Sequence, residues 1–208
     1  MKHEILFGVP LFRYHLDPSE IKELIEKKYK DSDGLPLNET PGGWDCTIKT
    51  DFDNSIQNIY SPFYDDIMKQ FSIDVGLESG NGKAMIHESW SNYYNGGMNQ
   101  EEHDHLPSFY SGIHYIKFHT DHEAVHLMNP LFQLYSFTYS RCRNDDALSA
   151  HPFSKQFECP EVKEGDIIIF PSFIRHRVNG VTSEEPRISV AFNINTIEGS
   201  TRRVFSQC

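Results

Sequence analysis

The chain has few cysteines, a shortage of basic side chains and no long apolar run. Its four cysteines are scattered without a CxxC pair, which argues against a zinc–thiolate site and favours a reducing compartment. Thirty carboxylates against 19 Lys and Arg residues give a formal net charge of −11, which disfavours binding to nucleic acid or to an anionic membrane. No stretch approaches the roughly 20 apolar residues that span a bilayer, and a signal-peptide core is missing. We expect a soluble, cytoplasmic protein.

The length of 208 residues indicates one domain, residues 1–208, with one core. Residues 1–80 have helical character and are expected to form a helical support region. Asp17-Pro18-Ser19-Glu20 has the residue types that begin a helix, and three apolar residues follow at helical spacing. These are Ile21, Leu24 and Ile25.

A second helix is expected from Ser61-Pro62, because apolar residues then recur every fourth position. The stripe comprises Phe63, Ile67, Phe71 and Val75. Such a stripe must be covered, and we expect it to lie on a sheet.

From residue 83 to about residue 196 the apolar residues alternate with polar ones, as they do in strands. The alternating strands expected are residues 84–90, 109–118, 131–139 and 187–195. Residues 167–170 are a continuous apolar run, which indicates a strand buried on both faces. Turns rich in Gly, Asn, Pro and acidic residues separate them. Many short strands of this kind predict a mainly β fold, a double-stranded β-helix or cupin-like jelly roll over residues 83–196, buttressed by the N-terminal helices.

Eleven histidines in an acidic chain direct attention to metal binding, and the densest group is Glu101-Glu102-His103-Asp104-His105. In an extended backbone His103 and His105 share one face and can bind one ion, while Asp104 points away. A solvated polar loop would also account for this segment, and for a single histidine that interpretation is the better one. His176, on a later strand, offers a third ligand.

Arg187 and Ser189 alternate with large apolar residues and so occupy the opposite face of their strand. If that face looks into the barrel, the guanidinium needs an anionic partner, because an unpaired buried charge is very costly. A ligand carboxylate held by the Arg fork and the Ser hydroxyl would serve. An ion pair with one of the chain's own carboxylates is the alternative.

These segments, taken in order, resemble the Fe(II)- and 2-oxoglutarate-dependent dioxygenases, in particular a branch of small oxygenases found in bacteria and phages. The matching pieces are Trp90-Ser91-Asn92-Tyr93-Tyr94, Gly97, His103-Asp104-His105-Leu106-Pro107, Ser111-Gly112-Ile113-His114-Tyr115, Gly165 to Ser172, His176, and Arg187 to Asn193. The resemblance covers nearly the whole chain and is most specific over residues 90–195.

The resemblance implies a role for each matching residue. His103 and His176 would bind iron, while Arg187 and Ser189 would hold the distal carboxylate of 2-oxoglutarate, with the Tyr115 hydroxyl beside them. Two further residues, Asn92 and Tyr94, would line the co-substrate pocket. The implied cofactors are Fe(II), 2-oxoglutarate and dioxygen, and the implied reaction is oxidative decarboxylation coupled to hydroxylation of a C–H bond.

One position departs from the family pattern, which has His-x-Asp or His-x-Glu before the distant histidine. Here His105 stands at the carboxylate position. Three histidines could bind iron with one less negative charge, Asp104 could replace His105 as ligand if the backbone turns there, or the literal His119-x-Asp121 could serve. We rank these alternatives in that order.

Three functions are compatible with this pattern: a 2-oxoglutarate-dependent dioxygenase, a non-catalytic jelly-roll module that binds a metal or a carboxylate, and a three-histidine cupin-type dioxygenase without a keto acid. Arg187 with Ser189 favours the first over the third. The expected partner is a small-molecule or peptide substrate of unknown identity, with no nucleic acid and no membrane, and the expected state is a monomer or a homodimer.

Overall fold

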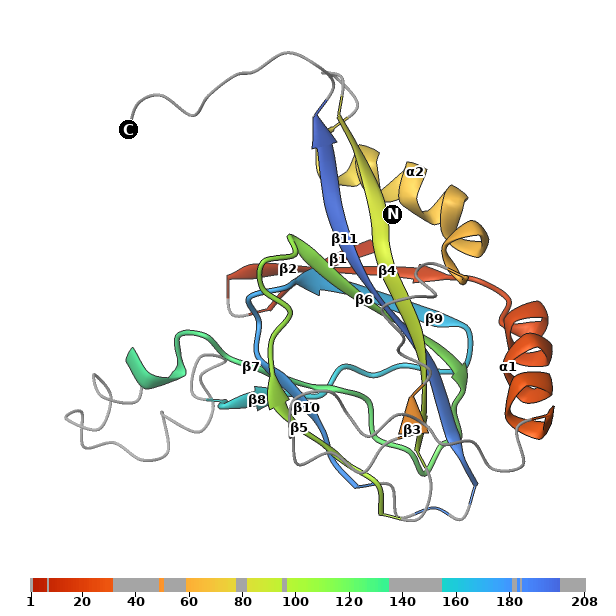
Figure 1. The fold of residues 1–208 in the computed structure, drawn as a ribbon. Helices are drawn as coiled ribbons and strands as arrows, with labels where there is room; N and C mark the ends of the chain where they lie inside the picture. Colours follow the sequence, from red (N-terminus) through yellow and green to blue (C-terminus); the bar gives the residue numbers. More distant parts are fainter. Residues whose placement is uncertain are drawn as a thin grey trace, which may run out of the picture.

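The structure is a computed structural model, and it describes residues 2–6, 8–31, 49–50, 59–77, 82–94, 97–134, 155–180, 183 and 185–198. Two antiparallel sheets face each other in a jelly roll (Figure 1). The larger sheet has the strand order β1-β2-β9-β6-β11-β4-β3, and the smaller one β5-β10-β7-β8. The predicted double-stranded β-helix is therefore confirmed.

The larger sheet contains the long strands. Its members are β1 (Lys2–Leu6), β2 (Val9–His15), β3 (Lys49–Thr50), β4 (Gly82–Tyr94), β6 (Tyr110–Lys117), β9 (Asp166–Pro171) and β11 (Arg187–Glu198). The smaller sheet is made of β5 (Gln100–His103), β7 (His126–Met128), β8 (Phe157–Glu158) and β10 (His176–Val178). Four of the five predicted strands coincide with β4, β6, β9 and β11.

The prediction of a strand over residues 131–139 is wrong where the structure describes it. Residues 132–134 are helical, and the rest of that stretch lies outside the described residues. Asn129 explains the local turn, because its side-chain oxygen accepts a hydrogen bond from the Leu131 N–H at 2.9 Å. Asparagine before proline favours such a turn over the start of a strand.

The N-terminal region is also less helical than predicted. β1 and β2 pair as an antiparallel hairpin, with Gly8 at a φ of 81° between them, and β2 joins the larger sheet through β9. The segment from Val9 to His15 alternates between the two faces of the sheet: Leu11 belongs to the apolar cluster that includes β7 and β10, and Phe12 to the cluster under the helices. This period of two distinguishes a strand from a helix.

Two helices cover one face of the larger sheet. The first, α1 (Ser19–Asp31), begins as predicted, since the Asp17 carboxylate accepts hydrogen bonds from the backbone N–H and the hydroxyl of Ser19. Ile21 and Ile25 are buried, whereas Leu24 is 40% exposed and lies outside the core. No described helix is long and apolar enough to cross a membrane.

The second helix, α2 (Asp65–Asp74), follows the 3-10 turn η1 (Ser61–Tyr64) and packs on β4. The side chains that it buries most deeply are Met68 and Phe71, together with Tyr64 just before it. The predicted stripe is correct at Phe71, whereas Phe63, Ile67 and Val75 are only partly buried at its edge. The initial 3-10 turn has three residues per turn. The residues that face the sheet therefore do not recur at every fourth position from Phe63.

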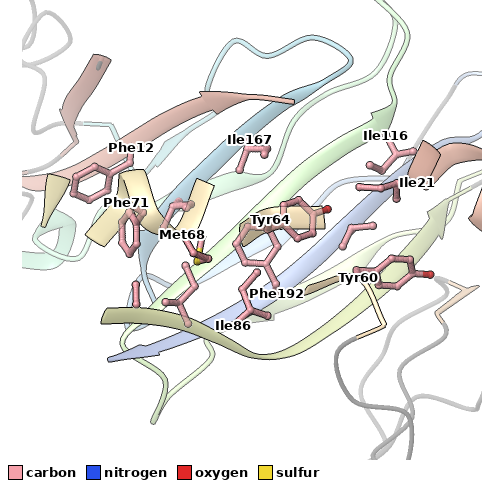
Figure 2. Close-up of a cluster of buried hydrophobic side chains, with 14 of the residues drawn as sticks. Phe12, Ile21, Tyr60, Tyr64, Met68, Phe71, Ile86, Ile116, Ile167 and Phe192 are labelled. Atoms are coloured by element: carbon pink, nitrogen blue, oxygen red, sulfur yellow. The ribbon is translucent and has the colours of Figure 1, made fainter. Parts of the chain in front are cut away.

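A single apolar core fills the space between these helices and the sheet (Figure 2). Phe12, Tyr64, Phe71 and Phe192 meet there, and the Tyr64 and Phe192 rings lie 4.8 Å apart. Gly112 is required at this place because a Cβ on it would overlap the Phe192 ring. The helices and this core cover one face of the larger sheet, which leaves its other face for polar side chains.

His114 is buried in this layer between two hydrogen-bond partners. Its Nδ1 lies 3.0 Å from the Tyr64 hydroxyl and its Nε2 lies 3.1 Å from the Leu16 carbonyl oxygen. The residue points away from the barrel, as its alternation with Tyr115 predicts, but the helices cover it. Burial is the main cause that lowers the pKa of His114 to about 4.

This buried histidine should make the metal-free protein less stable in mild acid. The unfolded chain takes up a proton near pH 6.5, whereas folded His114 does so only near pH 4, so stability falls as the pH drops through this window. His114 alone should account for about 1.4 kcal/mol per pH unit, or roughly 3 kcal/mol in all. We expect the pH slope of the unfolding free energy, measured by urea denaturation between pH 4 and pH 6.5, to decrease by about 1.4 kcal/mol per pH unit in His114→Gln. An unchanged slope would show that His114 is not the titrating group.

Candidate metal centre and carboxylate pocket

Three histidines come together inside the barrel. His103 ends β5 and His176 begins β10, and these two residues are direct partners in the antiparallel register of the smaller sheet. His105 lies two residues beyond His103. One ligand nitrogen from each of the three lies within 4.8 Å of the others. Among the described residues, no other group of three His, Cys, Asp or Glu side chains comes this close.

Hydrogen bonds orient two of the three imidazoles. The Nδ1 atom of His103 lies 2.7 Å from the Glu101 carbonyl oxygen, and that of His176 lies 3.0 Å from the Ile174 carbonyl oxygen. A carbonyl can only accept, so each Nδ1 carries the hydrogen and each Nε2 presents a lone pair as the donor atom. Such an arrangement is typical of metal-ligating histidines.

The three imidazoles are neutral near pH 7. Burial lowers the pKa of His103, lowers that of His105 to about 3, and lowers that of His176 well below its usual range. The neighbouring histidines lower the last two pKa values further, because a second positive charge is unfavourable nearby. Three neutral nitrogen donors around one point suit a divalent first-row transition metal such as Fe(II).

Asp104 does not join this cluster. Its Oδ1 accepts a hydrogen bond from the Leu106 N–H at 3.2 Å, in a turn two residues long. His119 and Asp121 contact one another at 3.3 Å, with side chains 53% and 69% exposed, and His176 is not grouped with them. The arrangement of His103, His105 and His176 agrees with the first of the three alternatives from the sequence.

Arg187 lies on the same inner surface and is 1% exposed. It donates one hydrogen bond, from Nη1 to the Glu123 carbonyl oxygen at 2.7 Å, while its buried Nε has no partner among the described residues. In the described part of the chain no carboxylate forms an ion pair with it. Its guanidinium carbon lies 4.6 Å from the Tyr94 ring centroid. This cation–π contact stabilises the guanidinium but does not neutralise its charge.

Three polar side chains lie in a row beside Arg187, on three adjacent strands. Ser189 of β11 is the register partner of Asn92 on β4 and of Tyr115 on β6. The Oδ1 of Asn92 is buried without a hydrogen-bond partner among the described residues. The Tyr115 hydroxyl accepts from the Val125 N–H at 3.3 Å, and burial is the main cause that raises its pKa to about 12, so it keeps its own hydrogen for donation.

One cavity connects the histidines with this polar row. Its walls include all three histidines, Arg187, Ser189, Asn92 and Tyr94. Tyr115 is not one of the lining residues, but its ring centroid lies 5.8 Å from the Arg187 guanidinium carbon. The cavity therefore offers a metal-binding set of nitrogens at one place and an unpaired cation at another. A small molecule with a metal-chelating group and a carboxylate would match both.

Sequence reasoning missed several residues of the cavity wall. Trp90 is buried, and its ring lies 5.6 Å from the His105 ring and lines the cavity. Asn193 and Ser111 also line it. Alternation along β11 was the available signal, because Asn193 occupies the same face as Arg187 and Ser189.

The fold and this site define a jelly-roll protein with a candidate transition-metal centre and, in the same cavity, a buried arginine that has no ion-pair partner among the described residues. A family model described as "Putative 2OG-Fe(II) oxygenase" matches residues 88–193, slightly more than half of the chain. The chain belongs to this family of 2-oxoglutarate- and Fe(II)-dependent oxygenases. The matched range contains every proposed metal and co-substrate ligand.

Solved structures of low sequence identity share the fold. A prolyl-4-hydroxylase from Pseudomonas putida is 13% identical over 89% of this chain and 92% of its own, with a TM-score of 0.52. HygX from Streptomyces hygroscopicus, with nickel, 2-oxoglutarate and hygromycin B bound, is 10% identical over 89% and 82%, with a TM-score of 0.51.

A third structure, an oxidoreductase of the 2OG-Fe(II) oxygenase family from Burkholderia pseudomallei, is 14% identical over 66% of this chain, with a TM-score of 0.45. The chain spans 54% of that protein's length. No curated protein matches the sequence.

Proposed function

We propose that the protein is a dioxygenase that couples oxidative decarboxylation of 2-oxoglutarate to hydroxylation of a substrate C–H bond. The observation that carries the proposal is the buried Arg187, which lines the same cavity as the three histidines and lacks an ion-pair partner among the described residues. A buried charge of this kind is stable only with a counter-ion, and a co-substrate carboxylate would supply one. A three-histidine dioxygenase without a keto acid would have no use for it.

In this proposal His103, His105 and His176 each hold Fe(II) through one imidazole nitrogen. When bound, Fe(II) supplies the redox chemistry by which dioxygen converts 2-oxoglutarate to succinate and carbon dioxide while one oxygen atom enters the substrate. Arg187 and Ser189 hold the distal carboxylate, with Tyr115 donating its hydrogen from behind. Asn92 and Tyr94 fix the position of the keto acid from the neighbouring strand. The buried walls of the cavity exclude water.

The substrate is proposed to be a small molecule or a peptide. The net charge of −11 supports this choice over nucleic acid, because a phosphate backbone would be repelled. The segment that follows His105 in the chain exposes two apolar side chains, Leu106 and Phe109, which are 61% and 58% exposed. These apolar side chains favour a substrate with an apolar surface.

An anaerobic titration tests the proposal. We expect metal-free protein to bind Fe(II), and the addition of 2-oxoglutarate to produce a visible charge-transfer band that neither component gives alone. Admission of dioxygen should then release succinate, at a slow basal rate without substrate. Iron binding without the band would favour a three-histidine enzyme or a binding module, and a band without succinate would favour the binding module.

A further inference from the structure

His105 differs from the other two histidines in what faces its Nδ1 atom. For His103 and His176 that atom faces a backbone carbonyl oxygen, whereas for His105 it lies 3.5 Å from the side-chain nitrogen of Asn193. A histidine that binds a cation through Nε2 carries its hydrogen on Nδ1 and needs an acceptor there. An amide nitrogen cannot accept that hydrogen.

Asn193 has a second possible arrangement because its neighbours can exchange roles. Its Oδ1 accepts a hydrogen bond from the Ser111 hydroxyl at 2.9 Å, and its Nδ2 donates to Glu88 Oε2 at 3.3 Å. The Ser111 hydroxyl is 2.7 Å from that of Ser172, and either oxygen can be the donor. If the amide turns over, Nδ2 donates to Ser111, which donates to Ser172, and Oδ1 faces His105.

Glu88 has another partner in that second arrangement. Its Oε1 lies 3.3 Å from the Nδ1 of His87. A bulge makes this possible, since Asn193 pairs with Glu88 and Ile194 pairs with Ile86, which leaves His87 as the extra residue of β4. After the turnover the Asn193 oxygen faces Glu88, and a carboxylate cannot donate to it. The side chain of Glu88 is 30% exposed, so the carboxylate can turn away from that oxygen and be solvated by water.

We propose that Asn193 is the positioning residue of the third metal ligand, His105, and that its amide turns over when the cation binds. In the metal-free protein the amide nitrogen faces Glu88 and His105. In the loaded protein the amide oxygen accepts the Nδ1 hydrogen of His105, and the Ser111–Ser172 hydroxyl pair anchors the amide in either orientation. This inference rests on the proposed function, because it requires His105 to be a ligand. It assigns to Asn193 the role that backbone carbonyls have for the other two histidines.

Two substitutions at Asn193 test the acceptor role. Asn193→Leu keeps the approximate shape but cannot accept, and we expect its Fe(II) affinity to fall by about 10- to 100-fold. The ionised side chain in Asn193→Asp is an acceptor and never a donor. This variant should therefore bind Fe(II) at least as tightly as the unchanged protein. Affinity is measured anaerobically by competition with a colorimetric ferrous chelator, and folding is verified by near-UV circular dichroism of the metal-free proteins.

Asn195→Leu is the matched control, since it makes the same change two residues further along β11, at a side chain that does not line the cavity. It should leave the Fe(II) affinity unchanged. An unchanged affinity in Asn193→Leu would overturn the role of Asn193, as would an equal loss in Asn193→Asp, which would indicate packing instead. Failure of the unchanged protein to bind Fe(II) would overturn the proposed function together with this inference, so the two failures are distinguishable.

Discussion

Replacing Arg187 by alanine should weaken 2-oxoglutarate binding by at least about 30-fold and abolish succinate formation, because truncating one member of a buried, hydrogen-bonded charge pair costs about 2–5 kcal/mol. Fe(II) binding should persist, since Arg187 is not a metal ligand. The measurement is the anaerobic titration of the Fe(II)-loaded variant with 2-oxoglutarate, followed at the charge-transfer band. Arg175→Ala is the control, because Arg175 has a side chain 53% exposed and pairs with Glu102 at 3.1 Å.

The same variant has a readout that does not depend on iron. In the unchanged protein, 2-oxoglutarate neutralises a buried cation and should raise the melting temperature even when Mg²⁺ or no metal is present. In Arg187→Ala this stabilisation should disappear. Equal 2-oxoglutarate binding by both proteins would show that the co-substrate carboxylate binds elsewhere.

Removing a histidine of the metal centre should have the other large effect. We expect His103→Ala and His176→Ala each to lower Fe(II) affinity more than about 100-fold, because even a residue that only orients a ligand is worth 10- to 100-fold. Turnover of 2-oxoglutarate should be lost while the fold remains. Chelator competition and succinate release measure the two effects, and His119→Ala, at an exposed histidine, is the control. Unchanged turnover in both variants would refute the metal site.

Changes at the third position identify its ligand. His105→Asp restores the usual family pattern and should retain Fe(II) binding, whereas His105→Ala should lose it. Asp104→Asn should have little effect on Fe(II) affinity, because the Asp104 carboxylate accepts from the Leu106 N–H. A large loss in Asp104→Asn with none in His105→Ala would make Asp104 the ligand instead.

Much of the fold follows from periodicity. The alternation along residues 187–195 predicted β11, and the residue types at Asp17-Pro18-Ser19 predicted the start of α1. The hairpin of residues 2–15 was missed because its short strands are joined to the sheet by pairing with β9, which is more than 150 residues away in the chain. Contacts of this range leave little signal in a local window.

The site was predictable where one residue type carries the chemistry. His103, His105 and His176 were found from their spacing and from the resemblance, and the structure brings them together. Trp90 and Asn193 were missed because their relation to His105 depends on cross-strand register and on the bulge at His87. Neither can be deduced from one strand alone.

The alternation along β11 has a consequence for the evolution and engineering of this protein. Ile188, Val190, Phe192 and Ile194 belong to the core beneath the helices, whereas Arg187, Ser189, Ala191 and Asn193 line the cavity. Loss of a single codon within this strand would exchange the two sets and place a guanidinium among aromatic rings. The residues of β11 that line the cavity can therefore be varied by substitution, whereas an insertion or deletion within the strand would disrupt both faces. Ala191 has the smallest side chain of the β11 residues that line the cavity, so a larger residue there would reduce the cavity volume without breaking a polar contact.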